Sequence, residues 1–168
     1  MKRISLTNKS FEGASNVYLL DGERTTLIDA GDSREETKDE LRSSLREYGI
    51  EFSDVDQILL THWHNDHSGL AGAIQQESDA TVRVHEADAP IVERTSTAWS
   101  ELRNIQFESF SEWGIPENKQ QELRDTFWAP EDRGRAPTVT SFTHGDTFLA
   151  GDRTLEVVHA PGHSAGLS

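Results

Sequence analysis

The sequence predicts an α/β fold on the strength of three observations. Two short apolar runs flank Asp21-Gly22 in residues 16 to 31, NVYLLDGERTTLIDAG, which predicts two strands joined by a turn. Strand-like and helix-like patterns then alternate along the chain, as they do in domains built on a mostly parallel sheet. Finally, a cluster of histidines directly follows the apolar run 55 to 61, at the strand end where open α/β sheets place their sites.

The first predicted helix covers residues 32 to 50, DSREETKDELRSSLREYGI. Ser33 and Glu36 have the spacing of a capping box, and Gly49 is well placed to end the helix. The expected apolar stripe consists of Leu41, Leu45 and Tyr48. Further patterns predict a buried strand at 55 to 61, a loop at 62 to 69, a short helix at 70 to 78 and a strand at 80 to 86.

Residues 86 to 128 have a different character, with large apolar side chains at roughly helical spacing and a break at Gly114-Ile115-Pro116. We expect a helical hairpin there, carrying three of the four tryptophans: Trp99, Trp113 and Trp128. The hairpin either covers its own apolar face or serves as a lid or interaction surface, since aromatic side chains dominate such contacts. Residues 138 to 164 contain two Gly-Asp turns and predict antiparallel strands.

The composition limits the classes of function. A chain of 168 residues is long enough for one domain with its own core. Its 30 acidic and 16 basic residues give a formal charge of −14, and only four of the basic residues are lysine, which favours a salt-adapted, halophilic protein. The acidity argues weakly against a nucleic-acid partner. Because there is no cysteine, any metal must be held by histidine or carboxylate side chains.

The stretch THWHNDHSG, residues 61 to 69, carries the candidate chemistry. On a helix, His62 and His64 would point about 200° apart, which is the wrong geometry for a shared ligand. On a loop that follows a strand, both imidazoles can turn into one pocket together with Asp66 and His67. Imidazoles and carboxylates are ligands that zinc and similar divalent ions use, and four of them within six positions can serve two metals.

This stretch resembles the His-x-His-x-Asp-His signature of the metallo-β-lactamase fold superfamily. Two further segments match in the same order. NVYLLDG…TLIDAG resembles the opening hairpin with its Asp-bearing second strand, and VVHAPGHSAG resembles the segment with the next metal histidine. The resemblance implies one metallo-β-lactamase-like domain over residues 1 to 168, an αββα sandwich in which 86 to 128 form a helical insertion before the third metal histidine.

The resemblance also implies roles for individual residues. The first zinc would be held by His62, His64 and His163. A second zinc would take Asp66 and His67, with Asp66 also orienting water as the catalytic residue. Asp29 would orient the ligands by hydrogen bonding. The other histidines match no ligand position and are expected to be structural: His85, His144 and His159.

In the family, a bridging aspartate and a last histidine follow the segment that PGHS resembles, whereas this sequence ends at Ser168. We therefore expect the C-terminal half of the sandwich to be missing. The first metal site is then complete and the second lacks two ligands. On this interpretation the 168-residue chain by itself is a poor or inactive enzyme.

The resemblance implies metal-dependent hydrolysis of an ester, thioester or lactone by a metal-bound hydroxide. One or two zinc ions are the expected cofactor, with iron or manganese as alternatives. Other interpretations within the same fold are a phosphodiesterase or ribonuclease, which should show a basic RNA-guiding patch, and a persulfide dioxygenase-like iron enzyme. The densest basic cluster, EDRGRAP, has only two arginines beside two acids. The non-enzyme alternative is an inactive metal-binding fragment.

The N-terminal residues MKRISLTNKSF contain basic side chains without a following apolar run, so they do not resemble a signal peptide. No stretch has the length and apolarity of a membrane span. We expect a cytoplasmic protein that acts on a small-molecule substrate, without a membrane or nucleic-acid partner, and with a homodimer as the assembly to test.

Overall fold

The computed structural model describes residues 1–7, 13–127 and 134–168. Its centre is a six-stranded sheet in the order β1-β2-β3-β4-β5-β6. The strands are β1 (Lys2–Thr7), β2 (Ala14–Leu20), β3 (Thr26–Ile28), β4 (Gln57–Leu59), β5 (Thr81–His85) and β6 (Val139–Phe142). The first three strands pair antiparallel, and β3 to β6 pair parallel. The predicted α/β fold class is confirmed.

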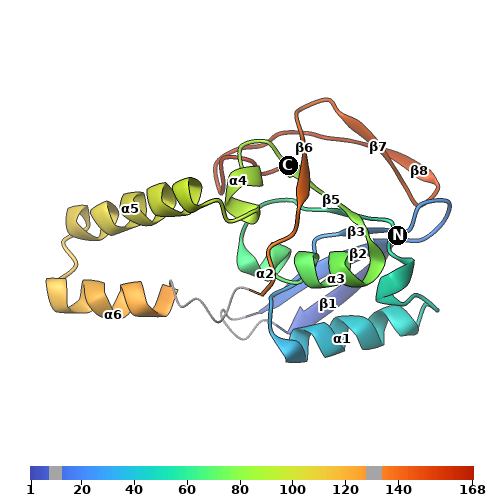
Figure 1. Cartoon of the computed structure of the whole chain (residues 1–168), viewed down its shortest axis with the longest axis horizontal. Coiled ribbons are helices and arrows are strands. Elements are labelled where there is room, and N and C mark those ends of the chain that lie inside the picture. Colours follow the sequence, from blue (N-terminus) through green and yellow to red (C-terminus); the bar gives the residue numbers. More distant parts are fainter. Residues whose placement is uncertain (8–12, 128–133) are drawn as a thin grey trace.

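Helices α1 (Glu35–Arg46) and α3 (Ala71–Ser78) cover one face of this sheet, and a two-stranded hairpin lies over the other (Figure 1). The helices are α1 (Glu35–Arg46), the 3₁₀ turn Phe52–Asp54, α2 (Asn65–Ser68), α3 (Ala71–Ser78), α4 (Ala89–Val92), α5 (Ser96–Glu112) and α6 (Glu117–Phe127). The hairpin consists of β7 (Thr147–Ala150) and β8 (Arg153–Glu156). The main core fills the space between α1, α3 and the sheet, with Leu41, Leu45 and Ile74 fully buried. Burial of this apolar surface is the principal stabilising contribution.

The start of α1 differs from the predicted capping box. The N-cap residue is Arg34, and it makes no side-chain capping hydrogen bond. Instead, the buried carboxylate of Asp32 accepts hydrogen bonds from the Arg34 amide at 3.0 Å and from the Thr37 hydroxyl at 2.7 Å. A carboxylate at this end also suits the positive pole of the helix dipole.

The end of α1 was predicted only in part. Leu41 and Leu45 are buried as expected, and Gly49 adopts a left-handed φ of 75° just beyond the helix, which glycine accommodates at no steric cost. Tyr48 does not continue the apolar stripe. The helix has already ended at Arg46, so the Tyr48 ring is 41% exposed and lies 5.5 Å from the Lys2 ammonium.

Two strands depart from the sequence interpretation. The N-terminal residues, which we did not predict as a strand, form β1, and the buried positions Ile4 and Leu6 show the two-residue period of a half-buried strand. Residues 138 to 164 were expected to be antiparallel throughout. Only β7 and β8 are, because β6 pairs parallel to β5 and extends the central sheet instead.

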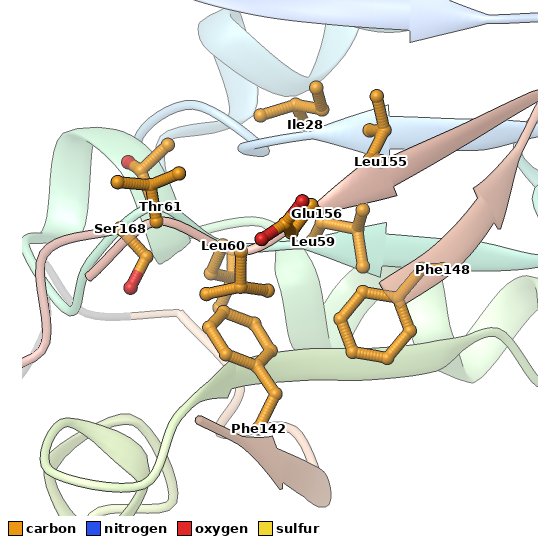
Figure 2. A pocket seen from close by; sticks show the side chains of 11 residues that line it. Ile28, Leu59, Leu60, Thr61, Phe142, Phe148, Leu155, Glu156 and Ser168 are labelled. Atoms are coloured by element: carbon orange, nitrogen blue, oxygen red, sulfur yellow. The ribbon is translucent and has the colours of Figure 1, made fainter. Parts of the chain in front are cut away.

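An apolar pocket of about 160 Å³ lies between the hairpin and the face of the sheet that the hairpin covers (Figure 2). Ile28 and Leu59 contribute from the sheet, and Phe148 and Leu155 from the hairpin. The full lining is Ile28, Leu59, Leu60, Thr61, Phe142, Phe148, Leu155, Glu156, Val157, Val158 and Ser168. Among the described residues no histidine lines this pocket, so it is distinct from the histidine cluster, although Thr61, the neighbour of His62, is part of its lining.

Helices α5 and α6 extend away from the sheet as an arm (Figure 1). The helices predicted for this segment are present. Within α5, only Phe110 is buried, and Trp113 at its end is 71% exposed. Trp128 lies outside the described residues. That the segment is an insertion within a single domain stays a prediction.

Candidate metal centre

Three imidazoles from two distant segments meet at one point of the structure. His62 and His64 follow β4, and His163 lies in the loop after β8. His62 Nε2 is 3.0 Å from His64 Nδ1, which is in turn 2.9 Å from His163 Nε2. One nitrogen from each ring lies within 4.8 Å of the other two, and no other such group of three occurs among the described residues. This arrangement can hold a metal ion.

The strand end determines where these side chains point. β4 ends at Leu59, and the chain then leaves the sheet without forming a helix until Asn65. In this irregular stretch, which bends at Thr61 and Trp63, His62 and His64 turn to the same side, as expected of a loop. Asp66 and His67 lie in the single helical turn α2, which we had not predicted.

Asp29 fixes the orientation of this loop from the end of β3. Its left-handed φ of 61° is a conformation in which aspartate is enriched among non-glycine residues. Its carboxylate accepts hydrogen bonds from the Thr61 amide at 2.8 Å and from the Thr61 hydroxyl at 2.9 and 3.0 Å. The same carboxylate lies 2.8 Å from His67 Nδ1. Asp29 therefore hydrogen-bonds to Thr61 and to His67, and it makes no direct hydrogen bond to His62, His64 or His163.

These contacts set the tautomers of two histidines. Because the Thr61 hydroxyl donates its proton to Asp29, it can only accept from His62 Nδ1, 3.0 Å away. His62 then has its lone pair on Nε2, the atom that faces His64. Likewise, His67 donates from Nδ1 to Asp29 and presents Nε2, which is 3.4 Å from Asp66 Oδ2. Such outer hydrogen bonds are what metal-binding imidazoles ordinarily require.

Asp66 and His67 form a second, adjacent pair. Asp66 Oδ2 also accepts a hydrogen bond from the Ser15 hydroxyl at 3.3 Å, and the His67 ring lies 4.2 Å from that of His62. Among the described residues, Asp66 and His67 do not form a group of three potential ligand atoms as close together as those of His62, His64 and His163. Its predicted role at a second metal stays a prediction.

Electrostatics favour the neutral forms of His62 and His64. Burial, followed by the neighbouring histidines, lowers the pKa of His62 to about 3. Burial and His163 also lower the pKa of His64, against the opposing charges of Asp66 and Asp88. Burial acts to lower the pKa of His67 too, but the hydrogen bond and charge of Asp29 outweigh it, so the pKa of His67 is raised.

These opposite shifts predict opposite effects on stability. In metal-free protein, His62 stays neutral while the unfolded chain takes up that proton near pH 6.5, so its contribution to stability is lost as the pH falls from about 6.5 towards 3. The His67–Asp29 pair contributes stability below pH 6.5 and loses it as the pH rises through the raised pKa of His67. Urea unfolding with EDTA at pH 7, 6 and 5 should therefore show a shallower acid-induced loss in His62→Gln and a steeper loss in His67→Gln. Parallel profiles for both variants and the wild type would contradict these assignments.

Sequence reasoning missed three residues that build the site. Thr61 connects Asp29 to His62, and Trp63 lies edge-on to His64 with ring centroids 4.3 Å apart. Asp88, at the start of α4, is completely buried and accepts hydrogen bonds from both loops that carry the clustered histidines. The sequence shows an aspartate shortly after a strand, but nothing local indicates that Asp88 is buried, so no sequence signal singled it out.

The remaining histidines lie apart from the three-histidine cluster. His85 is buried and stacks on His159, with ring centroids 4.0 Å apart. His159 Nε2 lies 2.8 Å from the Ala165 carbonyl, and His144 Nδ1 accepts the His159 amide at 3.3 Å. The structural roles expected for all three stay a prediction. Within the described part of the chain, no helix has the length and apolarity needed to cross a bilayer.

Comparisons with known sequences identify the family of the chain. The family model of the metallo-beta-lactamase superfamily matches residues 11–168. Probable metallo-hydrolase YqjP of Bacillus subtilis is 31% identical over 100 residues, which is 60% of this chain and 31% of that protein. Beta-lactamase-like protein 2 homolog of Drosophila melanogaster is 38% identical over 84 residues, 46% of this chain and 28% of that protein.

Solved structures agree with this family. A metallo-beta-lactamase family protein from Thermus thermophilus superimposes with a TM-score of 0.79 at 27% identity, covering 99% of this chain and 53% of that one. The subclass B3 metallo-beta-lactamase BJP-1 of Bradyrhizobium japonicum matches with a TM-score of 0.64 at 21% identity, over 98% and 50% of the two chains, and shares the fold. The chain thus spans about half the length of these structures and less of the curated relatives. On this evidence the chain belongs to the metallo-beta-lactamase superfamily.

Proposed function

We propose that the protein carrying this sequence is a zinc-dependent hydrolase of an ester, thioester or lactone. The observation that carries the proposal is the convergence of His62, His64 and His163, whose facing nitrogens lie within 4.8 Å of one another. Membership of a superfamily that includes a probable metallo-hydrolase supports hydrolysis as the reaction. The narrower substrate class and the choice of zinc rest on the motif resemblance.

The chemistry of the three histidines fits a divalent ion. Tetrahedral zinc with Zn–N distances of about 2.05 Å separates its ligand nitrogens by about 3.3 Å. The two closest nitrogen pairs here are 3.0 and 2.9 Å apart, so small side-chain movements would admit the ion. The lowered pKa values of His62 and His64 keep both rings neutral at pH 7, as metal ligation requires.

The side chains around the site then have separate tasks. His62, His64 and His163 would hold the ion, which when bound would supply Lewis acidity and lower the pKa of water. Thr61 and Asp29 hold His62 in the required tautomer. Asp66, whose carboxylate lies 3.4 Å from His67 Nε2, would accept a proton and orient the attacking water. No serine or cysteine nucleophile is needed for this chemistry.

Metal binding and substrate turnover test the proposal together. Purified protein, stripped with EDTA, would be titrated with Zn²⁺, Fe²⁺ and Mn²⁺ and analysed for metal content. It would then be assayed on an aryl ester, a thioester, a lactone, bis(p-nitrophenyl) phosphate and RNA, also in a version extended to the length of its relatives. Zinc-dependent cleavage of a carbonyl substrate supports the proposal. Cleavage of phosphate esters alone, or turnover that needs iron, would replace it, and metal binding without any turnover would favour the metal-binding fragment.

We further propose that the base of the α5–α6 arm contributes to substrate selection through Trp99. The Trp99 indole donates a hydrogen bond to the Ile91 carbonyl at 2.8 Å, and its ring lies 6.3 Å from that of Trp63, which contacts His64. Trp113 is the matched control, because it lies at the far end of the same helix and is largely exposed.

Trp99→Ala is expected to change the relative kcat/KM for aryl and alkyl esters several-fold, while Trp113→Ala leaves it unchanged. Removing Trp99 frees Trp63 to move and alters the wall beside His64. Zinc content should be the same in both variants. Equal substrate preference in Trp99→Ala and wild type would restrict the arm to a structural role.

A further inference from the structure

Asp88 occupies the N-cap position of α4, three residues after the end of β5. Its side chain makes no capping hydrogen bond to that helix, although capping is the usual reason for an aspartate at this position. The residue is 0% exposed. A buried carboxylate is costly unless several hydrogen bonds stabilise it, so the positions of its partners indicate what it does.

The partners of Asp88 belong to the two loops that carry the candidate metal ligands. Asp88 Oδ2 accepts hydrogen bonds from the Trp63 amide at 3.2 Å and from the Ser164 hydroxyl at 2.9 Å. Asp88 Oδ1 accepts the Gly166 amide at 2.9 Å. Trp63 stands between His62 and His64, and Ser164 directly follows His163. One carboxylate therefore joins the histidine pair to the third histidine, 99 residues later in the chain.

Glycine at position 166 is part of this contact. A Cβ atom there would lie 2.7 Å from the Asp88 carboxyl carbon and 2.9 Å from Oδ1. Those atoms cannot retreat without breaking the hydrogen bonds that keep the buried charge stable. The His163 loop and the Asp88 carboxylate are thus packed too closely for a side chain at position 166.

We propose that Asp88 is a positioning residue that sets the separation between His163 and the His62–His64 pair, and thereby the metal affinity of the site. It does not touch the imidazoles. It acts through the backbone on either side of them, by holding together the two loops that carry them. The inference rests on the proposed metal centre, and it assigns to Asp88 a role that neither the motif nor the family match provides.

The test compares Asp88→Asn with Asp32→Asn in the full 168-residue chain. Asparagine preserves the shape of the side chain, but its NH₂ group is a donor that must face at least one of the three donors that Asp88 binds. The Asp88 bridge, meaning its hydrogen bonds to Trp63, Ser164 and Gly166, therefore cannot form completely. Asp32 is the matched control: its carboxylate is also buried and accepts two hydrogen bonds, but these hold the start of α1. Zn²⁺ affinity would be measured by competition with a chromophoric chelator, and ligand geometry by the visible spectrum of the Co²⁺ form.

We expect Asp88→Asn to bind Zn²⁺ about 10- to 100-fold more weakly, the range found when outer-shell partners of metal ligands are lost. The Co²⁺ absorption bands should shift or lose intensity. Asp32→Asn should be destabilised towards urea yet keep wild-type affinity and spectrum. If Asp88→Asn binds as tightly as wild type with an unchanged spectrum, the positioning role is wrong even though the metal centre stands.

A second variant and a metal-free measurement distinguish failure of the Asp88 bridge from failure of the metal centre. Gly166→Ala retains the carboxylate, has no positive-φ strain at this position, and should weaken Zn²⁺ binding by about tenfold through crowding alone. In EDTA, amide hydrogen exchange at Trp63 and Gly166 should be faster in Asp88→Asn and unchanged in Asp32→Asn, a readout that needs no metal. Absence of Zn²⁺ binding by wild type would refute the metal centre and, with it, the proposed effect on affinity, whereas unchanged exchange would refute the bridge itself.

Discussion

A His62→Ala variant is expected to lose more than about a hundredfold in Zn²⁺ affinity, because removing a ligand should cost more than the 10- to 100-fold typical of an outer partner. His62 is the central member of the candidate cluster. Its ring contacts those of His64, His67 and His163, with centroid distances of 4.7, 4.2 and 4.9 Å. It is also 3% exposed and held in one tautomer by Thr61, so no neighbouring side chain can take its place without rearrangement.

The measurement is a Zn²⁺ titration of His62→Ala, His144→Ala and wild type, each checked for folding in EDTA by thermal unfolding. His144 is an exposed histidine outside the cluster, and its replacement controls for weak surface binding of zinc. Comparable affinity in all three proteins would mean that zinc binds elsewhere. A His62→Ala protein that is unfolded in EDTA would be replaced by His163→Ala, which removes an exposed ligand and should show the same loss of affinity with the fold intact.

The sequence predicted those helices, strands and turns that depend on residues close to one another in the chain. The buried strand before the histidines, the alternation of strands and helices, and the β7–β8 hairpin all follow from apolar periodicity and turn residues. The proximity of His163 to His62 and His64 could be expected only from the family resemblance, because no local signal links residues 99 positions apart.

The features that were missed depend on contacts between distant segments. Ser33 has the residue type and spacing of a helix cap, yet the N-cap is Arg34, and the Asp32 carboxylate holds the start of α1 through the Arg34 amide and the Thr37 hydroxyl. β6 joins β5 in parallel because the long α4–α6 excursion returns the chain to the edge of the central sheet, which a hairpin-like pattern in the sequence does not indicate. Asp88 was missed for the same reason, since its partners lie 25, 76 and 78 residues away.

Asp66 is the residue whose replacement should most clearly separate catalysis from folding. Its side chain is 24% exposed, on the short helix α2, and its contacts include the Ser15 hydroxyl and the His67 ring. Truncation to alanine therefore removes little buried surface, and the free energy of unfolding should change only slightly. The three histidines do not depend on it for their hydrogen bonds to one another.

In a catalytically active protein that carries this sequence, Asp66→Ala is expected to lower kcat by about 10²- to 10⁴-fold, the usual contribution of a positioned acid–base group. The reason is the loss of the carboxylate that adjoins His67 Nε2 and, through that ring, His62. Asp66→Asn should be nearly as inactive, since it keeps the shape of the side chain but cannot accept a proton. Both variants would be assayed at saturating Zn²⁺, with zinc content and urea unfolding measured in parallel. Near-normal turnover of either variant would show that Asp66 neither orients water nor accepts a proton, and the carboxylate would then be a structural partner of Ser15 and His67.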